Sequence, residues 1–473
     1  MSSQPNILIL MVDQLRYDAC GCFGSTVCQT PNLDRLAKEG MGFTNAFASV
    51  PLCTPTRASF WSGLWPSHHG VLINTHWRKP VTKQRLDRSV PILSEILKKS
   101  GYQTAHFGKW HVGPDSEMSA RGFDHVVTRT DFQTRLQSER KEFELRDLIT
   151  RDYIIKDYPF AGVTSAEGED FFEIWLCRRA EEWLRSHASS DQPFFCVVST
   201  PGPHPGYVVP ESYAARYDPA QMPLWPNVRD DLRDKPAVHR LYRDVIAQCG
   251  DLSDDEWRTC IARYYAFVSL IDEEYGRLLA LLDELDLSEN TLALFVSDHG
   301  DLIGAHQLFD KGPMMYDEQL HIPLVVRWPG IVPNGEQCDA MITFLDLMPT
   351  LVEAAGLSLP RPVDGRSLLP FLHGETIADW PDDIYLQYSG EGISLYSVRA
   401  VRSRRYKYVY YPYDQDELYD EEEDPWEMHN LANEPEAGPI LAEMKKRMVC
   451  WMERAEDVMV DWNVNLTPKR RAI

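Results

Sequence analysis

The chain has 473 residues, enough for two or three domains or for one large domain with a smaller appendage. Hydrophobic residues make up 44% and charged residues 25%, an ordinary globular composition that argues against wholesale disorder. Because 48 basic residues are set against 71 acidic ones, the net charge of −23 argues against binding nucleic acid through a broad basic surface or docking on an anionic membrane. A local cationic pocket for a small anion remains compatible with this balance.

We do not expect the N-terminal residues to act as a targeting signal. The first apolar run, NILILMV from Asn6 to Val12, ends at Asp13 and lacks a preceding basic region and a small-residue cleavage site. No apolar run reaches the roughly 18 residues of a membrane span, so we expect a cytoplasmic protein without a transmembrane helix. Ten cysteines in such a chain favour free thiols over a disulfide framework. Cys20-Gly21-Cys22 also lacks the paired spacing of a zinc site.

Short apolar runs recur along the chain, and each ends abruptly at polar or turn-forming residues. Runs of this length and composition predict strands that are buried on both faces. In chain order they are NILILMV before Asp13-Gln14, QTAHFG before Lys109-Trp110-His111, PFFCVVST before Pro201 and His204, TLALFVS before Asp298-His299, and IPLVVRW before Pro329-Gly330.

Segments with helical signals lie between these runs. Thr30 and Pro31 suit the start of a helix that ends at Gly40, and PILSEILKKSG ends as helices do. Apolar spacing from Ile261 to Leu285 predicts a long helix. This alternation predicts an α/β fold with a large, mostly parallel sheet sandwiched by helices. Ligands bind beyond the carboxyl ends of such strands, so the polar residues that follow the strands are expected to converge.

The pattern changes after about residue 370. SVRAVRSRRYKYVYY alternates as exposed antiparallel strands do, and a final helix is predicted from about Glu436 to Arg454. We therefore predict a main domain over residues 1–370 and a smaller α+β subdomain over residues 371–473, with a small antiparallel sheet and a helix. The acidic run from Glu421 to Asp424 favours a solvated turn over a cation site.

One short segment carries the strongest chemical signal. CTPTRASFWSG begins at Cys53 and has Arg57 four residues later, and Cys-x-Pro-x-Arg resembles the sulfatase signature. The resemblance covers nearly the whole chain, because segments similar to the family's other motifs follow in the family's order. These are PNILILMVDQLRYDACGCFG, TPNLDRLAKEGMGFTNAFA, GKWH, PHPGY, SDHGD, FDKGPMMYDE and ELYDEEEDPWEMHNLA. The resemblance implies an alkaline phosphatase-like fold in which residues 1–370 form the catalytic domain.

The resemblance also implies that a maturation enzyme oxidises Cys53 to formylglycine, an aldehyde that hydrates to a geminal diol. One diol oxygen would attack sulfur and release the alcohol, and the second hydroxyl would then lose its proton as sulfate is expelled. From the residues alone, Cys53 lies where a loop enters a predicted helix, and free backbone N–H groups there stabilise anions. The alternative for a lone cysteine is an inert buried thiol.

Four residues are candidate ligands for one divalent cation by the same resemblance: Asp13, Gln14, Asp298 and His299. Oxygen donors favour calcium. The family more often has a second Asp in place of Gln14 and often has Asn in place of His299. These variants, which also occur among sulfatase relatives and phosphonate monoester hydrolases, reduce the negative charge and add a nitrogen donor, so manganese is the alternative. Taken alone, Asp13 would be interpreted as a turn residue at a strand end.

Five further residues are candidates for catalysis. Arg57 would brace the diol or the sulfate with its planar fork of donors, although a surface ion pair is the simpler interpretation of one arginine. By resemblance, Lys109 stabilises the diol oxygen and His111 accepts the proton when sulfate leaves. His204, held between two prolines, would contact the sulfate or the leaving group and is a candidate general acid. Lys311 is the matching cation for the sulfate and the leaving oxygen.

The sequence says less about the substrate pocket. Its rim is predicted at Asn74 to Arg78, at Tyr207 and around Trp225, and the tryptophan content identifies no substrate. Packing or capping explains four other histidines near these motifs equally well: His69, His76, His306 and His321.

Three functional hypotheses remain open. The first is hydrolysis of a small-molecule sulfate monoester to an alcohol and inorganic sulfate. The second keeps the fold but acts on phosphonate monoesters or phosphodiesters; Gln14 and His299 suit it, whereas Lys109-Trp110-His111 suits a sulfatase better. The third is a non-catalytic anion-binding protein with an unmodified Cys53. A homo-oligomer is compatible with each.

Overall fold

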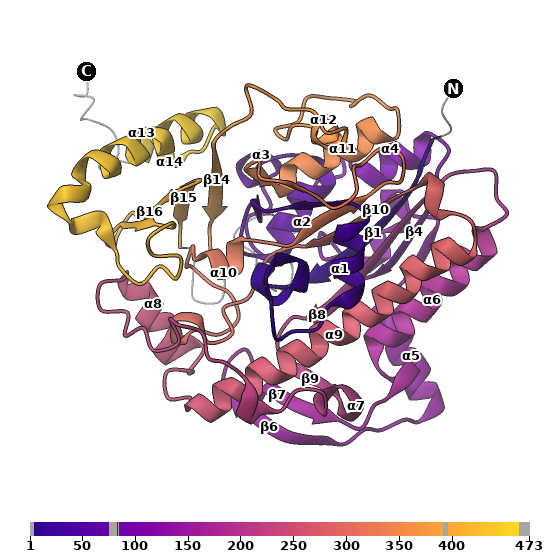
Figure 1. The fold of residues 1–473 in the computed structure, drawn as a ribbon, viewed down its shortest axis with the longest axis horizontal. Helices are drawn as coiled ribbons and strands as arrows, with labels where there is room; N and C mark the ends of the chain where they lie inside the picture. Colours follow the sequence, from indigo (N-terminus) through magenta and orange to yellow (C-terminus); the bar gives the residue numbers. More distant parts are fainter. Residues whose placement is uncertain (1–3, 75–82, 84, 391–395, 463–473) are drawn as a thin grey trace.

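An eight-stranded sheet runs through the centre of the computed structural model, which describes residues 4–74, 83, 85–390 and 396–462 (Figure 1). In order across the sheet, the strands are β12 (Glu336–Cys338), β2 (Met41–Phe43), β11 (Leu324–Arg327), β10 (Thr291–Ser297), β1 (Asn6–Asp13), β8 (Phe194–Pro203), β4 (Gln103–Gly108) and β5 (His125–Val127). From β10 to β5 all neighbours are parallel. The predicted large, mostly parallel sheet is confirmed.

Strand β1 explains why helices cover both faces of this sheet. Ile7 and Ile9 join one buried apolar cluster, whereas Leu8 and Leu10 join another. Successive side chains of a strand point to opposite faces, so an unbroken apolar run requires cover on both sides. One face is covered by α1 (Pro31–Lys38), α6 (Phe172–His187) and α9 (Asp254–Glu284), and the other by α2 (Cys53–Ser62), α4 (Leu93–Lys99), α11 (Leu347–Ala354) and α12 (Leu369–Leu372) (Figure 1).

The predicted helices are present, with shifts at their ends. Helix α9 begins at Asp254, earlier than the apolar spacing indicated, because Ser253 caps it. The Ser253 hydroxyl accepts the Glu256 N–H at 3.3 Å, and the Glu256 carboxylate accepts the Ser253 N–H at 2.8 Å. This reciprocal cap satisfies two backbone donors ahead of the first apolar turn.

One expectation about the strand ends is wrong. Strand β11 runs antiparallel to both β10 and β2, so Pro329 and Gly330 follow it at the opposite edge of the sheet. The segment between β10 and β11 starts and returns at the same edge, so β11 enters the sheet where β10 leaves it. The other four apolar runs end at one common edge.

The C-terminal region forms a second, antiparallel sheet covered by a helix (Figure 1). Its elements are β14 (Asp383–Tyr388), β15 (Val398–Ser403), β16 (Tyr406–Tyr410), β17 (Glu417–Asp420), α13 (Gly438–Arg454) and α14 (Met459–Trp462). The predicted strands and final helix are confirmed, but their predicted exposure is wrong. Val401 and Tyr408 pack against Met448 of α13, whereas Val409 packs with Leu52 of the main body, so both faces are buried.

Buried ion pairs explain the alternation that suggested exposed strands. The ammonium of Lys407, on β16, pairs with Asp317 at 2.6 Å, Glu427 at 2.6 Å and Glu421 at 3.5 Å. The acidic run is therefore only partly a solvated turn, because Glu421 points inward. Arg402 adds a second positive charge, at 3.1 Å from Asp317 and 3.5 Å from Glu421, so the three carboxylates belong to an ion-pair network with two cations. The domain boundary at residue 370 falls within α12 and stays a prediction, as does a homo-oligomer.

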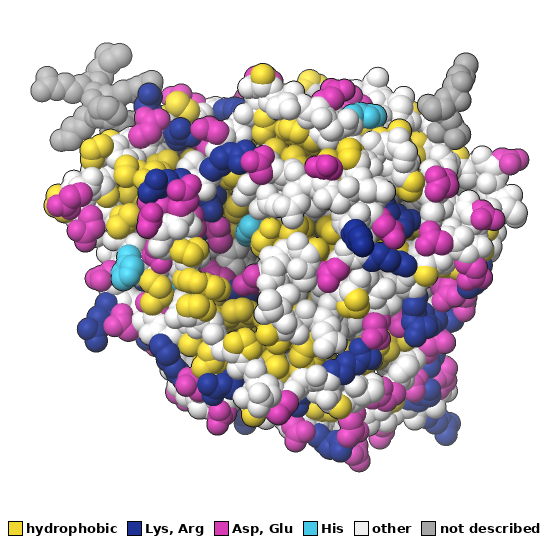
Figure 2. All heavy atoms as spheres, viewed as in Figure 1, with side chains coloured by type: hydrophobic (Ala, Val, Ile, Leu, Met, Phe, Trp, Pro, Cys, Tyr) yellow, Lys and Arg dark blue, Asp and Glu magenta, His cyan; other side chains and the backbone are white. Residues whose placement is uncertain are grey.

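Smaller elements complete the molecule. They are β3 (Ala46–Phe47), α3 (Pro66–His69), α5 (Arg129–Glu139), β6 (Leu145–Arg151), β7 (Tyr158–Thr164), β9 (Tyr207–Pro210), α7 (Glu211–Ala214), α8 (Ala237–Leu241), α10 (Asp317–Leu320) and β13 (Ile342–Thr343). Acidic and basic side chains are interspersed over the face in Figure 2. Within the described ranges, no helix combines the length and apolarity that a membrane crossing needs. All ten cysteines are free thiols.

Candidate functional site

The carboxyl ends of four neighbouring strands, β10, β1, β8 and β4, meet at one edge of the sheet. Asp13 is the last residue of β1, and Asp298, His204 and Lys109 directly follow β10, β8 and β4. The structure brings these residues together from positions almost 300 apart in the sequence, as their placement after parallel strands predicted.

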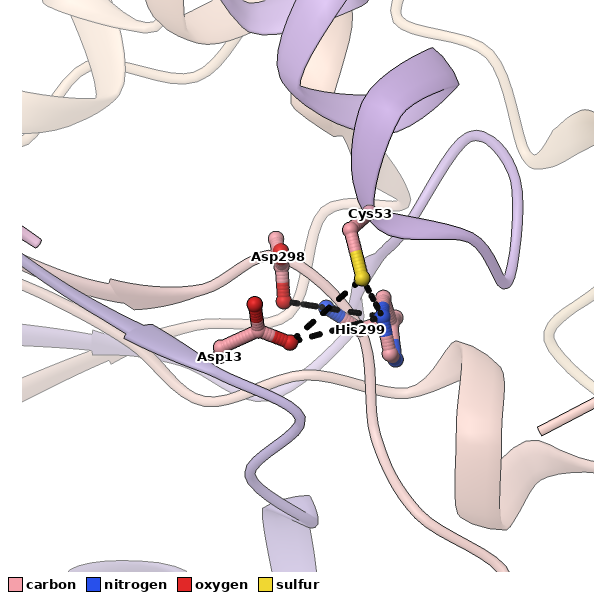
Figure 3. A group of neighbouring side chains, drawn as sticks. All are labelled: Asp13, Cys53, Asp298 and His299. Carbon is pink, nitrogen blue, oxygen red and sulfur yellow. Dashed lines mark hydrogen bonds and ion pairs between the residues drawn. The ribbon is translucent and has the colours of Figure 1, made fainter. Parts of the chain in front are cut away.

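Cys53 faces this edge from the first residue of α2 and is 1% exposed. Figure 3 shows its side chain pointing from the helix start toward Asp13, Asp298 and His299. Its Sγ atom lies 3.2 Å from His299 Nε2 and 3.5 Å from Asp13 Oδ1. One ligand atom from each of these four residues lies within 4.8 Å of all the others.

The hydrogen bonds of His299 and the charges around Asp13 set their ionisation. His299 Nδ1 donates to the carbonyl of Gly300 at 2.8 Å, which leaves the Nε2 lone pair facing the cluster. Burial lowers the pKa of His299, which favours the neutral ring, although Asp298 and Asp13 oppose the shift. Burial alone would raise the pKa of Asp13, but the nearby cations Lys109 and Arg57 hold it well below its usual value.

This donor set fits a divalent cation. It offers two buried carboxylates and an imidazole lone pair. Gln14 follows Asp13 and is buried, and its amide oxygen accepts from Lys311 at 2.7 Å. Gln14 has φ of 70°, and its backbone N–H donates to Asp298 Oδ1 at 3.1 Å. A non-glycine residue in the left-handed region is uncommon, and such strain concentrates at functional sites. The Cys53 sulfur occupies the place of the oxygen that oxidation to formylglycine would introduce.

Arg57 lies one helical turn after Cys53 and is 1% exposed. Its Nε donates to Asp298 at 2.7 Å, one terminal nitrogen donates to Ser199 Oγ and to the Lys109 carbonyl at 2.8 Å each, and the other lies 3.5 Å from Asp13. The sequence predicted contact with the diol or the sulfate. In the structure the guanidinium ties the two cluster carboxylates to the end of β4, and its contact with a diol or sulfate stays a prediction.

The other candidate catalytic residues surround the cluster on its open side. The ammonium of Lys109 pairs with Asp13 and keeps 18% exposure. His204 donates from Nδ1 to the Pro205 carbonyl at 2.8 Å, so its Nε2 accepts from the Lys311 ammonium at 2.9 Å. His111, with φ of 59°, lines the same opening as Lys109 and His204.

Lys109, His111 and His204 border a cavity of about 890 Å³. Its lining also includes six apolar side chains, those of Phe132, Leu136, Phe143, Phe171, Phe172 and Phe267. The predicted rim is wrong for two residues that are buried elsewhere: Tyr207 donates to Asp301 at 2.6 Å, and Trp225 donates to the Ile303 carbonyl at 2.8 Å. Asn74 is also buried and accepts the Thr54 N–H at 3.0 Å, and residues 75–78 lie outside the described ranges.

Glu173 was missed by sequence reasoning because a glutamate in the first turn of a helix is ordinary. It is 4% exposed, lines the cavity and accepts the Gly202 N–H at 3.1 Å, which links α6 to the loop that carries His204. Burial raises its pKa from 4.5 to about 7, with Arg129 opposing the shift. The burial and the raised pKa of Glu173 follow only from its position in the fold.

The raised pKa of Glu173 predicts a pH-dependent stability. Since the folded state holds the proton more tightly, its contribution is complete below about pH 4.5 and is lost as pH rises to about 7. Glu173→Gln keeps an acceptor for Gly202, so its unfolding free energy relative to wild type should increase by about 1–3 kcal/mol between pH 4.5 and pH 8. Urea unfolding at several pH values measures this. Glu182→Gln, an exposed position on α6, is the control, and a difference that does not change with pH would contradict the assignment.

Asp310, beside Lys311 in FDKG, was also missed. It is 3% exposed, and its Oδ1 accepts from Gln14 Nε2 at 2.7 Å and from Lys311 Nζ at 2.9 Å. Burial would raise its pKa, but Lys311 and His204 lower it to about 2. An acidic residue next to a candidate cation was the available signal, although many surface pairs share that pattern.

The histidines set aside by the sequence have structural partners where the structure describes them. His69 bonds to Ser59 at 3.2 Å, His306 to Asp230 at 2.6 Å, and His321 Nε2 to the Thr44 carbonyl at 2.9 Å. His76 lies outside the described ranges.

Family models match most of the chain. The model described as "Sulfatase" matches residues 5–357, and the model described as "N-sulphoglucosamine sulphohydrolase, C-terminal" matches residues 304–454. A choline-sulfatase of Rhizobium meliloti is 31% identical over 93% of this chain and 84% of its own length. A Delta 4,5-hexuronate-2-O-sulfatase of Bacteroides thetaiotaomicron is 27% identical over 99% of this chain and 93% of its own length.

Solved structures share the fold over nearly the whole length. The phosphonate monoester hydrolase of Agrobacterium radiobacter aligns with a TM-score of 0.82 at 24% identity, covering 95% of this chain and 96% of that one. The phosphonate monoester hydrolase from Silicibacter pomeroyi aligns with a TM-score of 0.80 at 25% identity, covering 97% of both chains. With the sulfatase model matched over residues 5–357, the chain belongs to the sulfatase family of sulfuric ester hydrolases.

Proposed function

We propose that this protein hydrolyses a small-molecule sulfate monoester to an alcohol and inorganic sulfate, with formylglycine derived from Cys53 as the nucleophile. The observation that carries the proposal is the placement of Cys53 at the start of α2, within 3.5 Å of two candidate metal ligands, one of which pairs with the Lys109 ammonium. A nucleophile, anion-stabilising donors and cation ligands at one strand edge support displacement at a tetrahedral anion. The proposal requires a maturation enzyme as a partner.

Asp13, Gln14, Asp298 and His299 are the proposed ligands of one divalent cation. When bound, the cation supplies Lewis-acid stabilisation of a nucleophilic oxygen and of the sulfate charge. We propose Ca²⁺, because carboxylate and amide oxygens dominate the set, with Mn²⁺ as the alternative because His299 contributes nitrogen. Arg57 fixes the orientation of the two carboxylates and offsets their charge.

Lys109, His111, His204 and Lys311 are proposed to act on the substrate. Lys109 holds the developing oxyanion at position 53, and His111, on the cavity side, accepts the proton when sulfate leaves. Lys311 neutralises the sulfate. His204 Nε2 accepts from Lys311 in the resting arrangement, so it must gain a proton at Nε2 before it can protonate a leaving alcohol. Substrate binding that draws Lys311 onto the sulfate would free that nitrogen.

Hydrolysis assays on converted protein test the proposal. Protein produced with a formylglycine-generating enzyme should hydrolyse nitrophenyl sulfate or another ester in a panel that includes choline sulfate and sugar sulfates. Cys53→Ala, produced identically, is the control. Absence of turnover above this control across the panel would refute the proposal, and sulfate binding without turnover by an unmodified thiol would favour the anion-binding alternative.

A phosphonate monoester hydrolase is the second candidate. The likeness to two such enzymes and the presence of Gln14 and His299 support it. Lys109-Trp110-His111 supports the sulfatase instead, and we expect a higher kcat/KM for a nitrophenyl sulfate than for the matched nitrophenyl phosphonate. Steady-state kinetics with both esters decide this, and the reverse ranking would establish the second candidate.

A further inference from the structure

The amide of Gln14 has its orientation fixed by an acceptor that sequence reasoning did not consider. A carboxylate can only accept, so the Asp310 Oδ1 atom 2.7 Å away selects the NH₂ group of Gln14. The other end of the amide is then its oxygen, which accepts from the Lys311 ammonium at 2.7 Å. Because Asp310 Oδ1 also accepts from Lys311 at 2.9 Å, losing Asp310 would remove one of the two contacts that orient the amide and loosen the other.

Lys311 is held by the same carboxylate. Its three ammonium protons have three acceptors: Gln14 Oε1 at 2.7 Å, Asp310 Oδ1 at 2.9 Å and His204 Nε2 at 2.9 Å. One carboxylate oxygen therefore anchors both a candidate metal ligand and a candidate sulfate-binding cation. The Asp310 carboxylate is not itself in the group of mutually close ligand atoms around Cys53.

Asp310 is itself held in place. Its other oxygen accepts from the Tyr153 hydroxyl at 2.7 Å, which lies 2.8 Å from the Tyr242 hydroxyl. Its backbone carbonyl accepts the Leu302 N–H at 2.9 Å, and its φ is 64°. Because both oxygens of Asp310 are hydrogen-bonded and its backbone is strained, the orientation of its carboxylate is fixed.

We propose that Asp310 is a positioning residue that turns the Gln14 amide oxygen toward the cation and holds Lys311 between Gln14 and His204. The inference rests on the proposed function only in assigning Gln14 to the cation. Mutation of a residue that orients a metal ligand typically lowers metal affinity or activity by about 10- to 100-fold.

Metal titration provides the test, because it does not depend on turnover. In metal-stripped protein with an unconverted Cys53, Asp310→Leu should bind Mn²⁺ and Ca²⁺ about 10- to 100-fold more weakly than wild type by calorimetry. Asp310→Asn, which retains one acceptor oxygen, should recover part of this loss. Tyr153→Phe leaves the Gln14-facing oxygen intact and should bind metal within about threefold of wild type.

A double-mutant cycle separates positioning from simple charge. In a Gln14→Ala background, Asp310→Leu or Asp310→Asn should weaken metal binding far less than in the wild-type background. If circular dichroism shows that Asp310→Leu does not fold, the same comparison of metal affinities can be made with Asp310→Asn. Unchanged metal affinity, or an equal loss in both backgrounds, would overturn the inference. A positive cycle without any sulfate ester hydrolysis would refute the proposed function alone.

Discussion

Replacing Cys53 by serine is expected to abolish steady-state hydrolysis while leaving a single burst of alcohol. The hydroxyl that this substitution introduces lies beside Asp13 and His299, and Lys109 pairs with Asp13, so it can attack sulfur once. It lacks the second hydroxyl whose deprotonation expels sulfate, so the sulfate ester stays on the protein. We expect about one equivalent of alcohol per protein, followed by a rate at least about 10⁴-fold below that of the converted enzyme.

Rapid-quench assays and intact-protein mass spectrometry measure the burst and the retained sulfate. The matched control is Cys53→Ala, which should give neither, because no nucleophile remains at the start of α2. Sustained turnover by the serine variant, in protein shown to lack an aldehyde, would mean that the second hydroxyl is dispensable. A working wild-type enzyme whose residue 53 still reacts as a thiol would contradict the mechanism more directly.

The sheet and its functional edge could be predicted because they depend on local patterns. Unbroken apolar runs such as Asn6 to Val12 indicate strands buried on both faces, and parallel strands place the residues that follow them at one edge. Asp13, Lys109, His204 and Asp298 therefore converge without any information about their contacts. The cysteine motif adds its own signal, because Cys53 lies at a helix start that the sequence indicates.

The remaining features depend on contacts between distant segments, which no local pattern encodes. Alternation in β15 and β16 indicated solvent on one face, but Lys407 is buried because Asp317 and Glu427 arrive from elsewhere to neutralise it. Strand β11 runs antiparallel to β10 because the segment that joins them returns to the edge of the sheet at which β10 ends. Asp310 and Glu173 acquire their importance from Gln14 and Gly202, which lie 296 and 29 residues away.

Arg57→Met is expected to destabilise the metal-free protein far more than the metal-bound protein. Without the guanidinium, the buried carboxylates of Asp13 and Asp298 lose their shared partner, and breaking such a buried pair costs about 3–5 kcal/mol. A divalent cation at the same carboxylates restores positive charge, so saturating metal should recover much of this loss. Thermodynamic linkage then requires the variant to bind metal more tightly than wild type.

Urea unfolding in chelator and in excess Mn²⁺ measures both stability differences, and calorimetry measures the affinities. Arg35→Met removes an exposed arginine beside Glu39 and should change stability by less than about 0.5 kcal/mol under either condition. An equal deficit with and without metal would assign Arg57 to packing rather than to charge balance. If the deficit is metal-dependent, the guanidinium and the cation act on one pair of carboxylates. Arg57 then keeps Asp13 and Asp298 ionised and aligned before the cation arrives, which a contact with the substrate alone would not require.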